Sequence, residues 1–101
     1  MFELENTKYE VHHTSLFKKQ YKKILKQGKD KKKFLQILGK LANGEKLEEK
    51  NKDHLLVDNK YFQNCRECHI TPDWVLVYKY NDDELILFLI QTGSHGEVLD
   101  K

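Results

Sequence analysis

Hydrophobic and polar residues alternate near the start of the chain and then change to a helical spacing. In residues 8–13 the alternation has the period of a half-buried strand. The next apolar positions follow the i, i+4, i+7, i+8 spacing of an amphipathic helix, namely Phe17, Tyr21, Ile24 and Leu25. Thr14 or Ser15 can cap the start of this helix, and Gly28 is placed to end it.

A second helical pattern follows after a very short connection. Asp30 is a suitable N-cap residue, Gly44 marks the end, and the apolar face consists of Phe34, Ile37, Leu38 and Leu41. Two helices joined by so few residues predict an antiparallel hairpin. Residues 45–53 are charged, with only Leu47 apolar, and predict an exposed loop that ends at His54.

The remainder of the chain has the pattern of strands. We expect strands at 61–70, 74–80 and 84–92, separated by turns at 71–73 and 81–83. Turns this short predict an antiparallel three-stranded meander. The order of strand, helix, helix and three strands predicts one α+β domain over residues 1–101, with both helices packed on one face of a mainly antiparallel sheet.

Composition narrows the class of protein. The hydrophobic fraction of 39% is well above that of a disordered chain with this much charge. No stretch approaches the roughly 18 consecutive apolar residues of a membrane span, and the first residues lack the basic and apolar regions of a secretory signal. We therefore expect a cytoplasmic protein with no membrane partner, in which Cys65 and Cys68 are reduced thiols.

Charge is distributed unevenly although the net charge is only +2. Residues 1–60 contain 15 lysines against 9 acidic residues, whereas residues 61–101 contain 3 basic against 7 acidic residues. The first helix carries a cationic face that suits RNA or ribosome docking, or an acidic protein partner, formed by Lys18, Lys19, Lys22, Lys23 and Lys26. The alternative is a helix face that the lysines only keep soluble.

The string from Cys65 to His69 has the C-x-x-C-H letters of a haem attachment site and some of the letters of a metal site. In a strand, residues i and i+3 point to opposite faces, so the two sulfur atoms cannot converge on one metal ion. A second cysteine pair is also absent from the sequence. We therefore expect neither a metal ion nor another cofactor.

Histidine residues are concentrated in the second half of the chain beside carboxylates and a tryptophan. Strand alternation places His69 on the same face as Glu67, and the meander brings Asp73 and Trp74 close to His95 at one edge of the sheet. Imidazole groups titrate near neutral pH, which suits proton transfer on a planar or phosphate-bearing substrate. Trp74 is either a core residue or a surface on which a base stacks.

As an ordered set, these strings resemble the YafQ branch of the RelE/ParE toxins of bacterial type II toxin–antitoxin systems. The resemblance is strong over residues 50–98 and rests on Lys52-Asp53-His54, the run from Tyr61 to Tyr80, the run from Asp82 to Leu87, and Thr92-Gly93-Ser94-His95. It implies a ribosome-dependent endoribonuclease that cuts mRNA in the ribosomal A site without a metal ion. It also implies a partner antitoxin of the ribbon-helix-helix type, through which alone the toxin would meet operator DNA.

The resemblance also implies the site residues. The acid–base and phosphate-contacting groups would be His54, His69, Asp73 and His95, and the substrate-binding groups would be Trp74, Gln91, Arg66 and Lys52. Cleavage needs a base for the ribose 2′-hydroxyl, an acid for the departing 5′-oxygen and positive charge near the phosphate. We assign Asp73 or His69 as the base and His95 as the acid, with His54 helping to hold the phosphate.

Two positions depart from the family pattern. Gln91 stands where family members usually have an arginine that grips phosphate, and Leu99 stands where an aromatic residue is common. A rival hypothesis is therefore a catalytically weak homologue that mainly binds its antitoxin and regulates their operon. A gyrase-directed relative of the same fold is a further alternative, but it would have no use for the histidine set.

Overall fold

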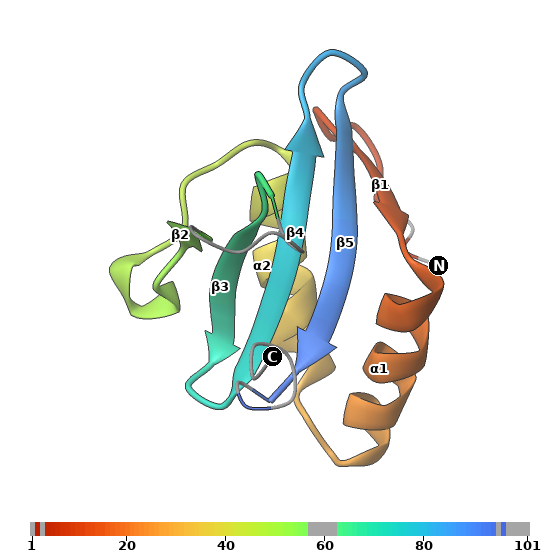
Figure 1. Ribbon diagram of the computed structural model, residues 1–101, viewed down its shortest axis with the longest axis vertical. Coiled ribbons are helices and arrows are strands. Elements are labelled where there is room, and N and C mark those ends of the chain that lie inside the picture. Colours follow the sequence, from red (N-terminus) through yellow and green to blue (C-terminus); the bar gives the residue numbers. More distant parts are fainter. Residues whose placement is uncertain (1, 3, 57–62, 95, 97–101) are drawn as a thin grey trace.

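The computed structural model describes residues 2, 4–56, 63–94 and 96. Its elements in chain order are β1 (Glu10–His13), α1 (Ser15–Lys26), α2 (Lys31–Ala42), the short 3-10 helix η1 (Glu49–Asn51), β2 (His54–Leu55), β3 (Arg66–Thr71), β4 (Trp74–Asn81) and β5 (Ile86–Gly93). The strands form one sheet in the order β1-β5-β4-β3-β2, in which β1 runs parallel to β5 and the other neighbours are antiparallel (Figure 1). The α+β class is therefore confirmed.

Local sequence signals fix both helices. The Thr14 hydroxyl accepts a hydrogen bond from the Phe17 backbone N–H at 2.9 Å, and the Asp30 carboxylate accepts one from the Lys32 N–H at 2.9 Å. Of the two caps proposed for the first helix, Thr14 is the observed one. Gly44, which follows α2, has a φ of +72°, a conformation that glycine adopts without strain.

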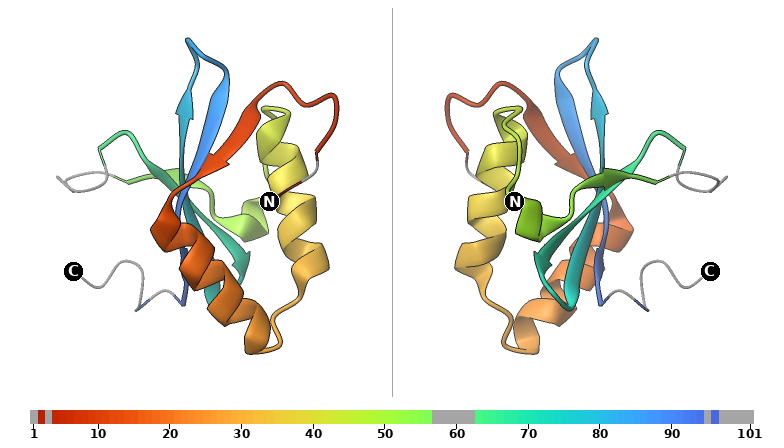
Figure 2. Two further views of the ribbon diagram at one scale, coloured as in Figure 1. Left: turned by 90° about the vertical axis from the view of Figure 1, so that its right-hand side faces the viewer. Right: turned by 90° about the vertical axis from the view of Figure 1, so that its left-hand side faces the viewer.

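The buried sides of α1 and α2 pack on one face of the sheet (Figure 2). Trp74 is completely buried there, and its ring stacks on Phe34 at a centroid distance of 5.5 Å. Its indole N–H donates to the Thr92 hydroxyl at 2.7 Å. A side chain enclosed on all sides presents no surface to a base, so the prediction that Trp74 binds substrate was wrong and the core alternative is the observed one.

Several strand boundaries differ from those predicted. His54–Leu55 pairs with β3 as a fifth strand, although we expected only the end of a loop there. The first long strand begins at Arg66, because Asn64 has a φ of +62° that interrupts extended backbone; residues 61 and 62 of the predicted strand lie outside the described residues. The third begins at Ile86, because Leu85 has a φ of +54° and is 46% exposed.

The other face of the sheet carries a smaller apolar cluster. Cys65, Val75 and Val77 are buried there, with Leu56 and Ile90 packed against them. Successive strand residues alternate between the two faces, so β4 supplies side chains both to this cluster and to the main core. In the part of the chain that the structure describes, no helix is long and apolar enough to cross a membrane.

Candidate functional site

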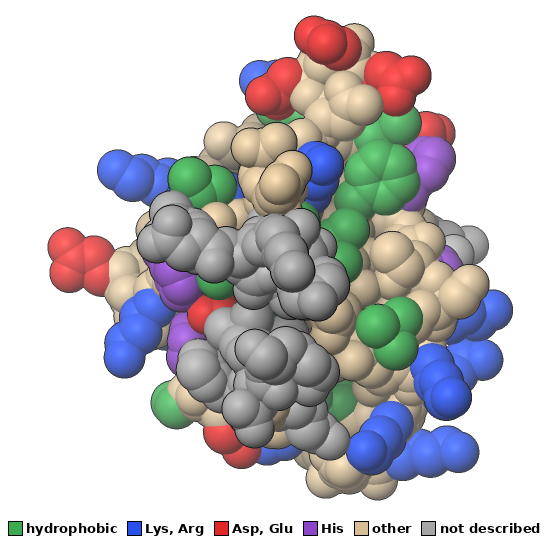
Figure 3. All heavy atoms as spheres, viewed as in Figure 1, with side chains coloured by type: hydrophobic (Ala, Val, Ile, Leu, Met, Phe, Trp, Pro, Cys, Tyr) green, Lys and Arg blue, Asp and Glu red, His purple; other side chains and the backbone are tan. Residues whose placement is uncertain are grey.

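A row of side chains crosses the sheet on the face opposite the helices. His54 of β2 pairs with Glu67 of β3, Glu67 with Val77 of β4, and Val77 with Gln91 of β5. Directly paired residues of neighbouring strands lie on the same face. Four segments that are far apart in sequence therefore converge here, and histidine side chains gather over β2 and β3 in the space-filling view (Figure 3).

Glu67 is the centre of this site. Its side chain is only 1% exposed, and one carboxylate oxygen, Oε1, lies 3.4 Å from His54 Nε2 and 4.0 Å from His69 Nε2. The other oxygen, Oε2, is buried and has no hydrogen-bond partner among the described residues. A buried carboxylate needs compensating positive charge or donors. The groups nearest to Oε1 that could provide it are the two imidazoles, one from β2 and one from β3.

The contacts of His54 define the orientation of its ring. The Nδ1 atom lies 2.7 Å from the backbone oxygen of Lys52, which can only accept a hydrogen bond, so Nδ1 carries a proton. The Nε2 atom then faces the Glu67 carboxylate at 3.4 Å. His54 is half exposed. The site therefore places an imidazole between solvent and a buried carboxylate.

A second set of contacts anchors the His54 segment from the helix side of the sheet. The Tyr78 hydroxyl donates to Asp53 at 2.5 Å, and Arg66 Nε donates to the same oxygen at 3.3 Å. Burial, followed by the hydrogen bond to Asp53, raises the pKa of Tyr78 well above its ordinary value, so the hydroxyl stays a donor. Because Arg66 pairs with Tyr78 across β3 and β4, it lies on the face opposite Glu67. Its contacts favour an anchoring role rather than the predicted substrate-binding role.

His69 is held through its backbone and its ring. The buried Asn51 of η1 donates its side-chain amide to the His69 carbonyl oxygen at 2.8 Å, and His69 Nδ1 lies 3.3 Å from the Pro72 carbonyl oxygen. The His69 side chain is 15% exposed. The turn and η1 thus orient the imidazole so that Nε2 faces Glu67.

Asp73 lies at the tip of the β3–β4 hairpin. Its carboxylate accepts hydrogen bonds from Lys29 at 2.5 Å and from the Thr71 hydroxyl at 2.9 Å. These hydrogen bonds, that of Lys29 first, lower the pKa of Asp73 below its ordinary value. A carboxylate stabilised in this way is a weaker base, which favours His69 over Asp73 for the base role that the sequence left open.

The remaining predicted residues are placed as follows. Gln91 lies on the face of the site, in the row with Glu67. Lys52 adopts a left-handed conformation and presents its carbonyl oxygen to His54. The α1 lysines are all exposed. His95 lies outside the described residues, so its predicted place beside His69 stays a prediction.

The cysteines belong to different faces of the sheet. Cys65 packs with Val75 and Val77, whereas Cys68 lies in the main core. Burial raises the pKa of both thiols, which disfavours the thiolate needed for a ligand or nucleophile. Among the described residues, no group of three or more His, Cys, Asp or Glu side chains is arranged to hold a metal ion.

Sequence reasoning left Glu67 out of the site, although it is the most central residue. The signal was present, because Glu67 and His69 are two residues apart in a strand and so share a face. Asp53 and Asn51 were also left out. Their roles depend on partners 25 and 18 residues away, which no local pattern identifies.

The sequence of this chain matches a known protein family and a characterised relative. The family model described as "Bacterial toxin of type II toxin-antitoxin system, YafQ" matches residues 9–100. The mRNA interferase toxin YafQ of Escherichia coli (strain B / BL21-DE3) is 31% identical over 88 residues, covering 86% of this chain and 91% of that protein.

The fold of this chain is also similar to those of solved toxin structures. A metal-bound toxin from Helicobacter pylori superposes with a TM-score of 0.82 at 36% identity, covering 90% of this chain and 99% of that one. YafQ in the E. coli DinJ-YafQ toxin-antitoxin complex superposes with a TM-score of 0.80 at 28% identity, covering 91% of this chain and 98% of that one. The chain therefore belongs to the YafQ family of bacterial toxins of type II toxin–antitoxin systems.

Proposed function

We propose that this toxin is an endoribonuclease that cleaves mRNA in the ribosomal A site without a metal ion, in the cytoplasm. The observation that carries the proposal is the buried Glu67 carboxylate between His54 and His69, at 3.4 Å and 4.0 Å from their Nε2 atoms. Two imidazoles on one sheet face supply both a proton acceptor and positive charge for a phosphodiester. The mRNA interferase relatives support the same reaction class.

The chemistry follows from these groups. His69 takes the proton of the ribose 2′-hydroxyl, and the 2′-oxygen attacks phosphorus and expels the 5′-oxygen of the next nucleotide. His95, as in the prediction from the sequence, protonates that oxygen, which leaves a 2′,3′-cyclic phosphate and a 5′-hydroxyl. His54, charged beside Glu67, stabilises the negative charge that develops on the phosphate. Glu67 keeps both imidazoles in place and does not itself exchange a proton with the RNA.

The test uses a cell-free translation system in which cleaved mRNA ends are mapped. Wild-type protein should cut mRNA that is being translated, and His69→Ala should lower the rate by roughly 100-fold or more, the usual contribution of one acid–base group. His12→Ala is a matched control, because His12 is an exposed histidine of β1 bonded to Glu10. A His69→Ala rate equal to that of the control would contradict the proposed chemistry.

Ribosome and metal dependence form a separate arm of this test. Purified protein freed of metal by a chelator and then dialysed should cleave on ribosomes at the untreated rate. The same protein should leave naked mRNA intact. Rapid cutting of naked RNA would show that the ribosome is dispensable, and a rate restored only by an added transition metal would rule out the metal-free mechanism.

A partner antitoxin completes the proposal. The relative in the DinJ-YafQ complex is bound to its antitoxin, and we propose a ribbon-helix-helix antitoxin for this chain, with operator DNA bound only through the complex. Gln91 lies in the row with Glu67 and favours a second candidate function, namely a weak nuclease that mainly binds its antitoxin. An uncharged side chain there provides none of the phosphate stabilisation that arginine gives in relatives.

The variant Gln91→Arg separates the two functions. We expect the cleavage rate on translating ribosomes to rise by roughly 5- to 150-fold, since about 1–3 kcal/mol of transition-state stabilisation is typical of one charged group. Gln27→Arg, which adds the same charge beyond the end of α1, is the control. A parent and a Gln91→Arg variant that both fail to cleave would favour the antitoxin-binding function.

A further inference from the structure

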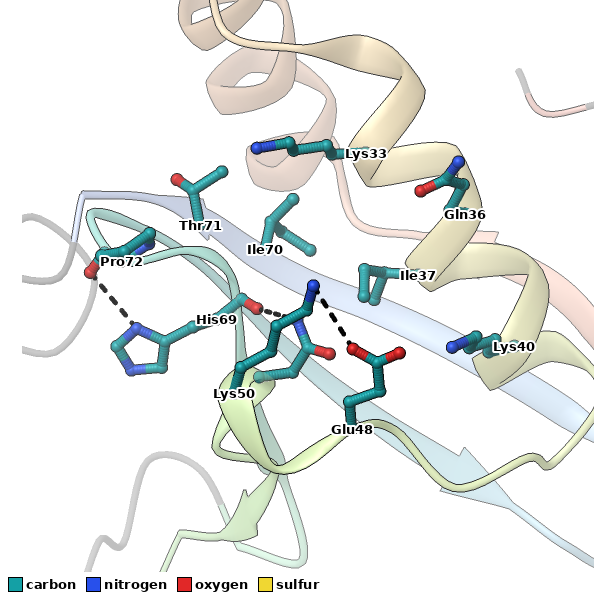
Figure 4. Close-up of a pocket in the computed structure, with 11 residues that line it drawn as sticks. Lys33, Gln36, Ile37, Lys40, Glu48, Lys50, His69, Ile70, Thr71 and Pro72 are labelled. Atoms are coloured by element: carbon teal, nitrogen blue, oxygen red, sulfur yellow. Dashed lines mark hydrogen bonds and ion pairs between the residues drawn. The ribbon is translucent and has the colours of Figure 1, made fainter.

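A cavity of about 550 Å³ lies beside the site, between α2, η1 and the end of β3 (Figure 4). One face of α2 lines it with residues at positions i, i+3, i+4 and i+7, namely Lys33, Gln36, Ile37 and Lys40. Glu48, Lys50 and Asn51 form the opposite wall, and residues 69–72 form the end nearest the hairpin. We call this cavity the α2–η1 groove.

The groove is cationic. Three of its side chains end in ammonium groups, those of Lys33, Lys40 and Lys50, against the single carboxylate of Glu48. Glu48 pairs with Lys50 at 3.3 Å, whereas neither Lys33 nor Lys40 forms an ion pair with another described residue. Two lysines that form no ion pair within the described residues face one cavity, which favours an anionic ligand.

His69 connects the groove on the helix side of β3 with the site on its other side. His69 lines the groove, and its ring also faces Glu67. In the close-up, the His69 ring and the Ile70 side chain leave β3 in different directions, while the Lys33 side chain reaches toward Thr71 and Pro72 (Figure 4). A chain that leaves the groove past His69, around the edge of β3, would therefore reach the His54–Glu67–His69 cluster on the opposite face of the sheet.

We propose that the α2–η1 groove binds the phosphodiester backbone of the mRNA strand next to the phosphate that is cut. This inference rests on the proposed function, because it takes the strand cut at the cluster as the occupant. Lysine ammonium groups on flexible stems contact phosphates without reading base sequence. The groove therefore sets affinity for the strand and leaves sequence preference to contacts elsewhere.

Binding is tested with the pair Lys33→Ala/Lys40→Ala. Lys31→Ala/Lys32→Ala is the matched control, because it removes the same charge from the first turn of the same helix outside the groove. The probe is a fluorescein-labelled 12-nucleotide single-stranded RNA of mixed sequence, 2′-O-methylated so that it cannot be cut, followed by fluorescence anisotropy from 50 to 200 mM KCl.

The expected result is a change in salt dependence. Each lost phosphate contact lowers the slope of log affinity against log salt by about 0.7 for a single strand, so the groove pair should lose about 1.4. The ratio of the RNA affinity of wild type to that of the groove pair should then fall roughly sevenfold between 50 and 200 mM salt. Equal slopes in the groove pair and the control pair would overturn the proposal, as would tighter binding of a 12-residue polyglutamate, which would assign the groove to an acidic protein segment.

Cleavage and ribosome binding distinguish this inference from the function on which it rests. On translating ribosomes, the groove pair should raise KM and leave kcat unchanged, and it should bind vacant ribosomes as wild type does. Lost binding to vacant ribosomes would assign the groove to ribosomal RNA and overturn the proposal. If wild type cleaves mRNA and the groove pair cleaves it with the same KM, only the proposed role of the groove is refuted. A wild type that binds the probe through the groove yet never cuts mRNA would refute the proposed function alone.

Discussion

Removing the Tyr78 hydroxyl should loosen the segment that carries His54. The ring of Tyr78 is completely buried in β4, and its hydroxyl donates at 2.5 Å to Asp53, which directly precedes His54. Tyr78→Phe keeps the ring and deletes only this donor. Because Arg66 still donates to Asp53 at 3.3 Å and Asp53 is 21% exposed, the carboxylate is not left without a partner.

The size of the effect follows from these contacts. A hydrogen bond to a charged acceptor contributes about 1.5–3 kcal/mol, and the remaining Arg66 contact places Tyr78→Phe near the lower end, at about 1.5–2 kcal/mol. For a domain of this size, each kcal/mol shifts the melting temperature by about 4–8 °C, so we expect a loss of roughly 6–16 °C. Cleavage should fall less than in His54→Ala, because the imidazole is still present.

Alkaline pH should reduce the loss of stability that Tyr78→Phe causes. Burial and then Asp53 raise the pKa of Tyr78, so the folded state holds the phenolic proton more tightly than the unfolded state. The contribution of this group is complete below the unfolded pKa of about 10 and is lost as pH rises above it, by up to about 1.4 kcal/mol per pH unit. Tyr78→Phe lacks this loss, so its deficit should shrink between about pH 10 and 11.

The assay is urea unfolding followed by circular dichroism at neutral and alkaline pH. Tyr21→Phe is the control, since the Tyr21 hydroxyl is buried without a partner among the described residues and burial raises its pKa. Tyr21→Phe should be as stable as wild type at pH 7, and its stability relative to wild type should rise at alkaline pH as that of Tyr78→Phe does. A Tyr78→Phe deficit no larger than that of Tyr21→Phe at pH 7 would refute the anchoring argument, and a deficit independent of pH would refute the titration argument.

Two further changes probe the site and the hairpin. Glu67→Gln, which keeps the shape and removes the charge between the imidazoles, should lower kcat on translating ribosomes by roughly 100-fold or more, because a carboxylate that holds a catalytic imidazole in place makes a large contribution to the rate. Folding is checked by circular dichroism, and an unchanged kcat would show that the carboxylate only fills space. Lys29→Met should remove the larger part of the depression of the Asp73 pKa and leave the part that the Thr71 hydroxyl causes. Wild type should therefore have a larger free energy of unfolding in urea than Lys29→Met above about pH 4, and this difference should disappear as pH falls through the lowered pKa of folded Asp73. A difference that stays constant down to about pH 2 would contradict this.

The sequence by itself determined the features that depend on neighbouring residues. The caps at Thr14 and Asp30 and the apolar stripe of α2 are local, because they involve residues within one or two turns of the same helix. The common face of Glu67 and His69 follows from the period of a strand. These features were predicted because each is decided by a spacing of a few residues.

Only the tertiary structure decided how these segments meet. The parallel pairing of β1 with β5, the strand at His54, the burial of Trp74 and the contact between Lys29 and Asp73 all join residues far apart in sequence. Register across a sheet depends on packing of the whole domain, since a slip of one residue would exchange its two faces. The row from His54 to Gln91 and the α2–η1 groove therefore exist only in the folded protein, where non-local packing outweighs local preference.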